Sequence, residues 1–112
     1  MEKELTMPTA VEQVDGIFVN SLHPGAVIDL ETRSRHYRIE YVAGDEVRIT
    51  GDPSFFSRPE SVRLEGSTRG RGSMEPGYIG RGMRLVFGRP EEGLSITTSE
   101  IVSIWVNSPA AS

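Results

Sequence analysis

A basic, glycine-rich stretch over residues 69–84 is the part of this sequence best suited to ligand chemistry. It reads Arg-Gly-Arg-Gly-Ser-Met-Glu-Pro-Gly-Tyr-Ile-Gly-Arg-Gly-Met-Arg. Arginine can pair with phosphate through two parallel hydrogen bonds, glycine exposes backbone amides, and a tyrosine ring can stack on a base. The stretch therefore supplies candidate phosphate-binding residues, namely Arg69, Arg71, Tyr78, Arg81 and Arg84.

The known glycine motifs do not match this stretch in detail. A dinucleotide fingerprint needs a glycine where the chain has Glu75, and a Walker loop needs a lysine, whereas the only lysine is Lys3. The letters of residues 77–80 are similar to the glycine loop of KH domains, but that family's flanking helices are missing. Two interpretations stay open: a phosphate-binding loop that is mobile without its ligand, or a long loop or hairpin between two core strands with solvated arginines.

Residue types that catalyse reactions or hold metals are sparse. The chain has no cysteine, its two histidines are His23 and His36, and neither has a carboxylate at ligand spacing. Asp29 and Glu31 alternate with apolar residues, so we expect them to face water on a strand and offset nearby arginines. No nucleophile-elbow motif is present. These observations predict a protein that is not an enzyme and that uses no metal or other cofactor.

Aromatic residues outnumber the plausible core positions of so small a domain. Tyr37, Tyr41, Phe87 and Phe18 fall on apolar positions of predicted strands, so we expect them in the core. Three others are candidate interface residues, because one points outward from a strand and two lie together in a loop: Trp105, Phe55 and Phe56. An N-terminal arm carrying Leu5 and Met7 is the alternative cover for these three.

Composition and charge fit one small domain. The chain has 112 residues and a formal net charge of −4, and it contains no apolar run long enough to span a membrane. Charge is unevenly spread: residues 1–32 carry −5, residues 33–89 carry +4 and residues 90–112 carry −3. The start of the chain lacks the pattern of a signal peptide, so a soluble, cytoplasmic protein is expected.

Apolar and polar residues alternate with a period of two along most of the chain, which is typical of strands with one buried face. Short turns rich in glycine, proline and aspartate separate these runs. The predicted strands span residues 16–19, 26–32, 36–42, 46–50, 61–65, 83–87, 94–97 and 101–106. Hydroxyl residues followed by an acid at residues 97–100 predict one helical turn before the last strand.

This arrangement of short strands, tight turns and one helical turn resembles the small barrels of the SH3-like and Sm-like group. The Arg81-Gly82 step before Met83 and Leu85 is similar to a step found in Sm-like proteins. The resemblance implies an all-β fold: a small, partly open barrel of about six antiparallel strands. We expect an N-terminal arm over residues 1–15, a single barrel domain over residues 16–106 and a disordered tail over residues 107–112.

Two functional hypotheses follow from these patterns. The first is an interaction module that acts through protein contacts or self-association, with a homo-oligomer expected and Trp105, Phe55 and Phe56 as apolar contacts. The second is a binder of nucleic acid or of another phosphate-bearing ligand through residues 69–84. Neither hypothesis involves a membrane.

Overall fold

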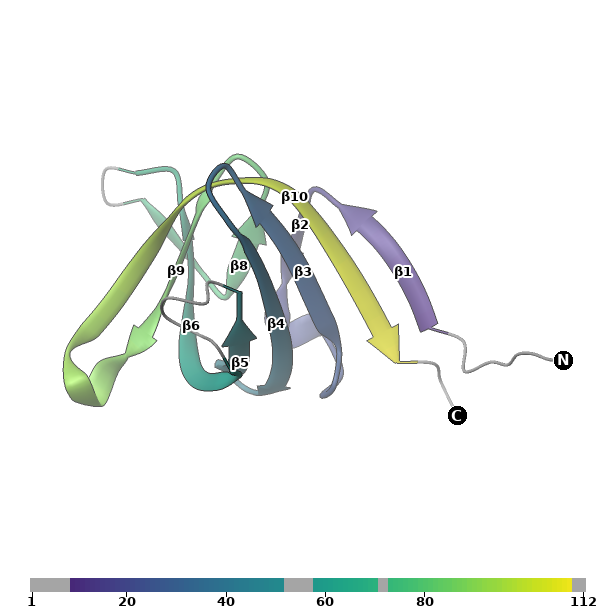
Figure 1. Cartoon of the computed structure of the whole chain (residues 1–112), viewed down its shortest axis with the longest axis horizontal. Helices are drawn as coiled ribbons and strands as arrows, with labels where there is room; N and C mark the ends of the chain where they lie inside the picture. The colour runs from purple at the N-terminus through teal and green to yellow at the C-terminus, as the bar shows by residue number, and fades with distance from the viewer. Residues whose placement is uncertain (1–8, 52–57, 71–72, 110–112) are drawn as a thin grey trace, which may run out of the picture.

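The alternation of apolar and polar residues produces an almost entirely β structure (Figure 1). The computed structural model describes residues 9–51, 58–70 and 73–109. Side chains along β4 alternate between buried and more exposed, as expected for a strand with one face on the core. The described strands are β1 Thr9–Val14, β2 Gly16–Phe18, β3 Val27–Thr32, β4 His36–Ala43, β5 Glu46–Thr50, β6 Glu60–Thr68, β7 Met74–Pro76, β8 Tyr78–Gly80, β9 Arg84–Arg89 and β10 Leu94–Pro109.

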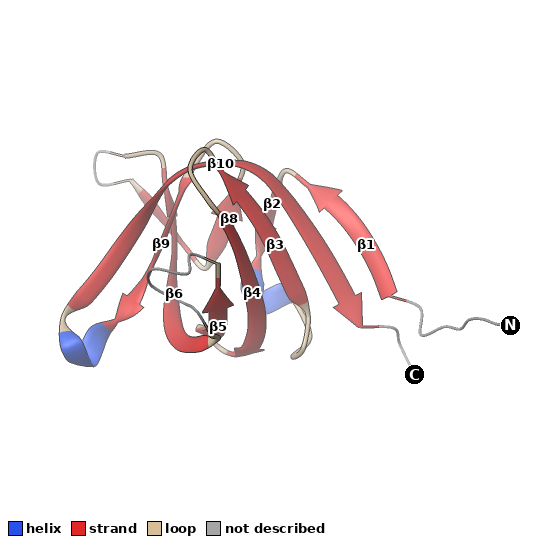
Figure 2. Ribbon diagram, in the orientation of Figure 1, coloured by secondary structure: helices blue, strands red, loops and turns tan. Residues whose placement is uncertain are grey.

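The strands form an antiparallel, barrel-like sheet, which confirms the predicted all-β barrel. Neighbouring strands follow the order β1-β10-β3-β4-β5-β6-β7, and β9 pairs with both β6 and β10. The long strand β10 reaches across the molecule in Figure 2: its first part pairs with β9, and its last part lies between β3 and β1. Strands β2 and β8 form a separate two-stranded sheet.

Pairing register places the apolar side chains on one inner surface. Leu30 lies opposite Tyr37, and Leu64 lies opposite Phe87, so aliphatic and aromatic groups meet across neighbouring strands. The rings of Tyr37 and Phe87 pack edge to face with centroids 6.2 Å apart. The core positions predicted for Tyr37, Tyr41 and Phe87 are confirmed, since all three are buried.

A short helical turn does precede the last strand, but its position differs from the prediction. The 3-10 turn η2 spans Pro90–Glu92, whereas residues 97–100 belong to β10, where the register against β9 shifts between Thr97 and Glu100. The physical reason is that Thr98 does not cap a helix. Its hydroxyl accepts a hydrogen bond from the backbone N–H of Leu85 on β9 (3.0 Å) and so serves a β-bulge.

Both ends of the predicted domain extend further into the sheet than expected. Residues 9–14 of the predicted arm form β1, and residues 107–109 of the predicted tail belong to β10. The two segments lie side by side, with Thr9 opposite Pro109 and Val11 opposite Asn107. The backbone groups of each segment thus find their partners in the other segment. Alternation of apolar and polar residues within one segment does not show which other segment it pairs with.

The remaining helical structure is small. A 3-10 turn, η1, spans Val19–Ser21 after β2, and its Val19 side chain is buried. No helix in the described part of the chain is long and apolar enough to cross a membrane.

Candidate interaction surfaces

The glycine-rich stretch is tied into the fold by two short strands. β7 pairs with β6, and β8 pairs with β2. Ile79 and Met83 are buried, so this segment contributes to the interior as well as to the surface. Of the candidate phosphate ligands, Arg69, Arg81 and Arg84 are exposed, and Tyr78 is half-buried. Arg71 lies outside the described residues, as do Phe55 and Phe56.

Tyr78 packs against the backbone and against Phe18 rather than standing free for a base. Its ring centroid lies 4.8 Å from that of Phe18 at an interplanar angle of 50°. Its hydroxyl occupies the space that a side chain at position 16 would need, so the ring lies across Gly16. These contacts fix the ring over the β2–β8 pair, which reduces the area left for stacking on a ligand.

The core position predicted for Phe18 is wrong, because its side chain is 52% exposed. Phe18 is the last residue of β2, and the next residue, Val19, enters the core with 2% exposure. The backbone N–H of Val19 donates to the carbonyl of Gly77 (2.9 Å), which fixes the chain at this turn. Within β2, Ile17 packs against the core, and neighbouring residues on a strand face opposite ways, so Phe18 points outward, where it meets Tyr78.

Several arginines are paired with carboxylates from distant parts of the chain. Arg33 contacts Glu100 (Nε to Oε1, 3.0 Å), and Arg81 contacts Asp15 (Nε to Oδ1, 3.3 Å). On the outer face of the sheet, Arg38 contacts Asp29 at 3.1 Å, which confirms the predicted compensation of that acid. These three arginines are therefore not simply solvated, although exposed ion pairs of this kind contribute about 1 kcal/mol or less each.

Trp105 faces outward from β10, as predicted, and is 42% exposed. Its neighbours Ile104 and Val106 are buried, so the strand alternates cleanly at this point. Trp105 lies opposite Gln13 of β1 and opposite Asp29 of β3. Because side chains two residues apart share a face, Val11 lies on the same outer surface as Trp105.

Val11 is the most exposed large apolar residue of the described chain, at 59%. We call the outer surface formed by Val11, Gln13 and Trp105 the β1 face. Strand β1 is the outermost strand of the sheet in Figure 1, and in residues 9–51, 58–70 and 73–109 it pairs with β10 alone. The β1 face therefore combines an exposed apolar pair with an available strand edge.

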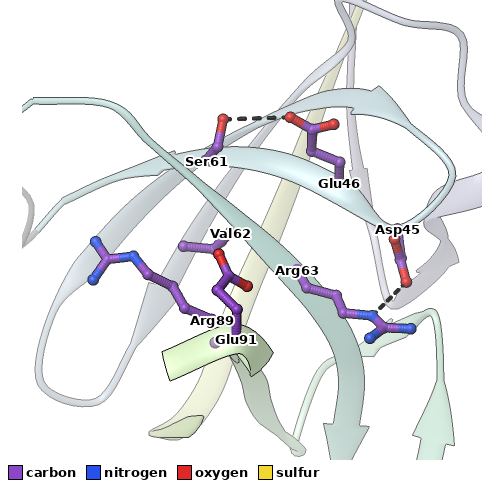
Figure 3. A pocket seen from close by; sticks show the side chains of 8 residues that line it. Asp45, Glu46, Ser61, Val62, Arg63, Arg89 and Glu91 are labelled. Carbon is purple, nitrogen blue, oxygen red and sulfur yellow. Dashed lines mark hydrogen bonds and ion pairs between the residues drawn. The ribbon is translucent and has the colours of Figure 1, made fainter. Parts of the chain in front are cut away.

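A cleft of about 530 Å³ lies between the β4–β5 turn, β6 and the segment around η2 (Figure 3). Its charged groups largely satisfy one another: Arg63 contacts Asp45 (Nε to Oδ2, 2.6 Å), and the Ser61 hydroxyl donates to Glu46 (3.4 Å). Arg89, at the same cleft, pairs with Glu60. Sequence alone could not show that these residues lie together, because their grouping depends on the turn that joins β4 to β5.

The grouping of metal-ligand residue types within the described residues and the similarity to known proteins add no functional assignment. Within residues 9–51, 58–70 and 73–109, no three histidine, aspartate or glutamate side chains are grouped as metal ligands. Comparison with protein-family models, with curated proteins and with solved structures found no match.

Proposed function

We propose that the protein is a non-enzymatic interaction module that associates with a second copy of itself by pairing the two β1 strands edge to edge. The observation that supports this proposal is the β1 face: exposed Val11 lies on a strand whose outer edge is unpaired within the described residues, and exposed Trp105 lies on the adjacent strand. Edges of this kind are templates for strand addition unless proline, lysine or a bulge protects them. The sequence Thr-Ala-Val-Glu-Gln-Val of β1 contains no proline and no lysine.

The sequence of β1 also favours one way of pairing with itself. A two-fold axis normal to the sheet gives antiparallel strands whose opposing residues must lie on the same face. Centring the axis on Val11 places Val11 opposite its own copy and Glu12 opposite Ala10. Centring it on Glu12 would place two carboxylates opposite each other, which is destabilising. The Val11-centred pairing places the two β1 faces side by side, with the two Val11 side chains in contact at the junction.

Replacing Val11 with lysine tests this proposal. The side chain is exposed in the single chain, so Val11→Lys should leave folding intact. In the pair it places two ammonium groups opposite each other, and we expect self-association to weaken about tenfold or more. Sedimentation velocity over a range of protein concentrations measures the change.

Leu94→Lys is the matched control, because Leu94 is an exposed apolar residue (39%) at the opposite end of β10. We expect it to associate like the wild type. A wild-type protein that stays monomeric at every concentration would rule out self-association. Equal weakening by both lysines would show that the contact does not involve β1.

A further inference from the structure

Two turns that carry arginine meet at the bulge of β10, at one end of the barrel. The backbone N–H of Arg33, in the turn between β3 and β4, donates to the carbonyl of Glu100 (2.9 Å). The backbone N–H of Gly82, in the turn between β8 and β9, donates to the carbonyl of Ile101 (2.8 Å). Both turns lie beside the bend of β10 at the top of Figure 1. The bulge therefore fixes two separate turns next to each other.

Glu100 lies near the arginines of this region and is in direct contact with one of them, Arg33. Its Oε1 accepts from Nε of Arg33 at 3.0 Å. Arg84 lies directly opposite Glu100 in the β9–β10 register, so their side chains leave the same face of the sheet. Nη1 of Arg69 and Oε2 of Glu100 both lie 3.9 Å from the point where a Cβ on Gly82 would stand. Of the three arginines, Arg33 thus contacts the carboxylate directly, Arg69 lies near it over Gly82, and Nη1 of Arg84 donates to the carbonyl of Thr98 (3.4 Å).

The surface over Gly82 is open and easily reached by solutes. Apart from Gly82 and its two chain neighbours, no atom lies closer than 3.9 Å to the point where a Cβ on Gly82 would stand. The side chain of Arg33 is 67% exposed and that of Glu100 is 38% exposed. A tetrahedral oxyanion above Gly82 would lie beside the guanidinium of Arg69 and the carboxylate of Glu100.

The local charge favours an anion even though the chain as a whole is acidic. The arginines of this region, including Arg81, outnumber the two acids that pair with them, Glu100 and Asp15. Four positive charges against two negative charges leave an excess of +2, on a chain with a formal net charge of −4. A dianionic group would complete the neutralisation of this surface.

We propose that the surface over Gly82 binds a phosphate group, with Arg33, Arg69 and Arg84 as donors and the Glu100 carboxylate as an internal competitor for them. Arginine suits this role because its planar fork matches the oxygens of phosphate. The inference is independent of self-association through β1, because none of its residues belongs to the β1 face. A phosphodiester of a single-stranded nucleic acid and a free phosphate ion present the same oxygens, so the two sources are separated by experiment.

The test measures binding of a fluorescein-labelled ten-nucleotide oligothymidylate by anisotropy at low salt, and binding of inorganic phosphate by titration calorimetry. The variants are Arg69→Gln, Glu100→Gln and the control Arg48→Gln. Arg48 is an exposed arginine on β5, opposite Glu40 and Ser61 and outside the proposed site. Circular dichroism confirms that each variant is folded.

Arg69→Gln should weaken binding about fivefold, because an exposed charge contact contributes up to about that factor. Glu100→Gln should strengthen binding by a similar factor, since it removes the competing anion. Arg48→Gln should change affinity less than twofold. Binding of the oligonucleotide alone would identify a phosphodiester strand as the ligand, and binding of inorganic phosphate would identify an isolated phosphate group.

Two results would overturn the proposal. If Arg69→Gln and Arg48→Gln weakened binding equally, general charge rather than this site would hold the ligand. If Glu100→Gln failed to strengthen binding, Glu100 would not compete for the arginines. Absence of binding to either probe by both the wild type and Glu100→Gln would also exclude a phosphate site.

Discussion

Gly66 allows three strands to pass close together. It belongs to β6, lies opposite Pro76 of β7 and opposite Val86 of β9, and has a φ of +148°. A Cβ at this position would collide with the carbonyl oxygen of Glu75. Because the obstacle is backbone, it cannot move aside as a flexible side chain would.

Gly66→Ala should therefore lower the free energy of unfolding by about 3 kcal/mol, combining backbone strain with overpacking. Gly44→Ala is the control: Gly44 also has a positive φ (+60°), but nothing lies within 4 Å of its missing Cβ. We expect a loss of about 1 kcal/mol there. Urea unfolding followed by circular dichroism measures both, and equal losses would contradict the close approach of β7.

Single residues also show where sequence patterns succeed. The outward direction of Trp105 could be predicted because it lies between two apolar residues on a long strand, and alternation then leaves one choice. The direction of Phe18 could not, because its strand ends at that residue and η1 begins at Val19. For a large apolar residue at the end of a short strand, the neighbouring residues that enter the core decide which face it lies on.

At the scale of an element, β10 depends on a hydroxyl inside its bulge. Thr98 is 5% exposed, and its hydroxyl accepts from the N–H of Leu85 while donating to the carbonyl of Ser99 (2.7 Å). It thus replaces the backbone partners that the register shift removes from the β9–β10 ladder.

Thr98→Val keeps the shape of the side chain but leaves the buried N–H of Leu85 without this acceptor. We expect the free energy of unfolding to fall by about 2 kcal/mol. Thr97→Val, one residue earlier and exposed, should change it by about 0.5 kcal/mol or less. A chemical-denaturation midpoint that moved equally for both variants would show that the Thr98 hydroxyl does not support the bulge.

This bulge explains the misplaced helical turn. The hydroxyls of residues 97–99 predicted helix caps, whereas the Thr98 hydroxyl accepts from the backbone N–H of Leu85 on β9, a partner that sequence could not show. The strands β7 and β8 escaped prediction for a related reason. Their partners, β6 and β2, are chosen by tertiary pairing, and three-residue segments are too short to show a period.

At the scale of the whole molecule, self-association through β1 predicts a specific cross-link. The chain has no cysteine, so Val11→Cys introduces a single thiol. In the Val11-centred pairing the two thiols lie opposite each other, and a short bis-maleimide should join most of the protein into covalent dimers. Gln13→Cys should react poorly, because Gln13 would lie opposite Thr9 of the second copy.

Gel electrophoresis under denaturing conditions measures the cross-linked fraction. If Glu12→Cys cross-linked efficiently and Val11→Cys did not, this register would be wrong, although the dimer would still form through β1. Equal, low yields at all three positions in a protein that still dimerises would place the contact elsewhere.

The fold pairs charged residues that lie far apart in the sequence. The acidic ends and basic middle of the sequence suggested separated charges, yet Asp15 pairs with Arg81 and Glu100 pairs with Arg33. The fold brings these oppositely charged segments together. The overall basic character of residues 69–84 could be predicted, whereas the contribution of Arg33 depended on a turn more than thirty residues earlier in the chain, brought close by β10.

The position of β10 also has a consequence for synthesis on the ribosome. It follows the other described strands in the chain, yet β1, β3 and β9 all pair with it. Until residues 94–109 have been translated, those earlier strands lack a neighbour that they have in the final sheet. The nascent chain therefore cannot complete its barrel segment by segment from the N-terminus, and β1, β3 and β9 stay exposed to aggregation until residues 94–109 have emerged.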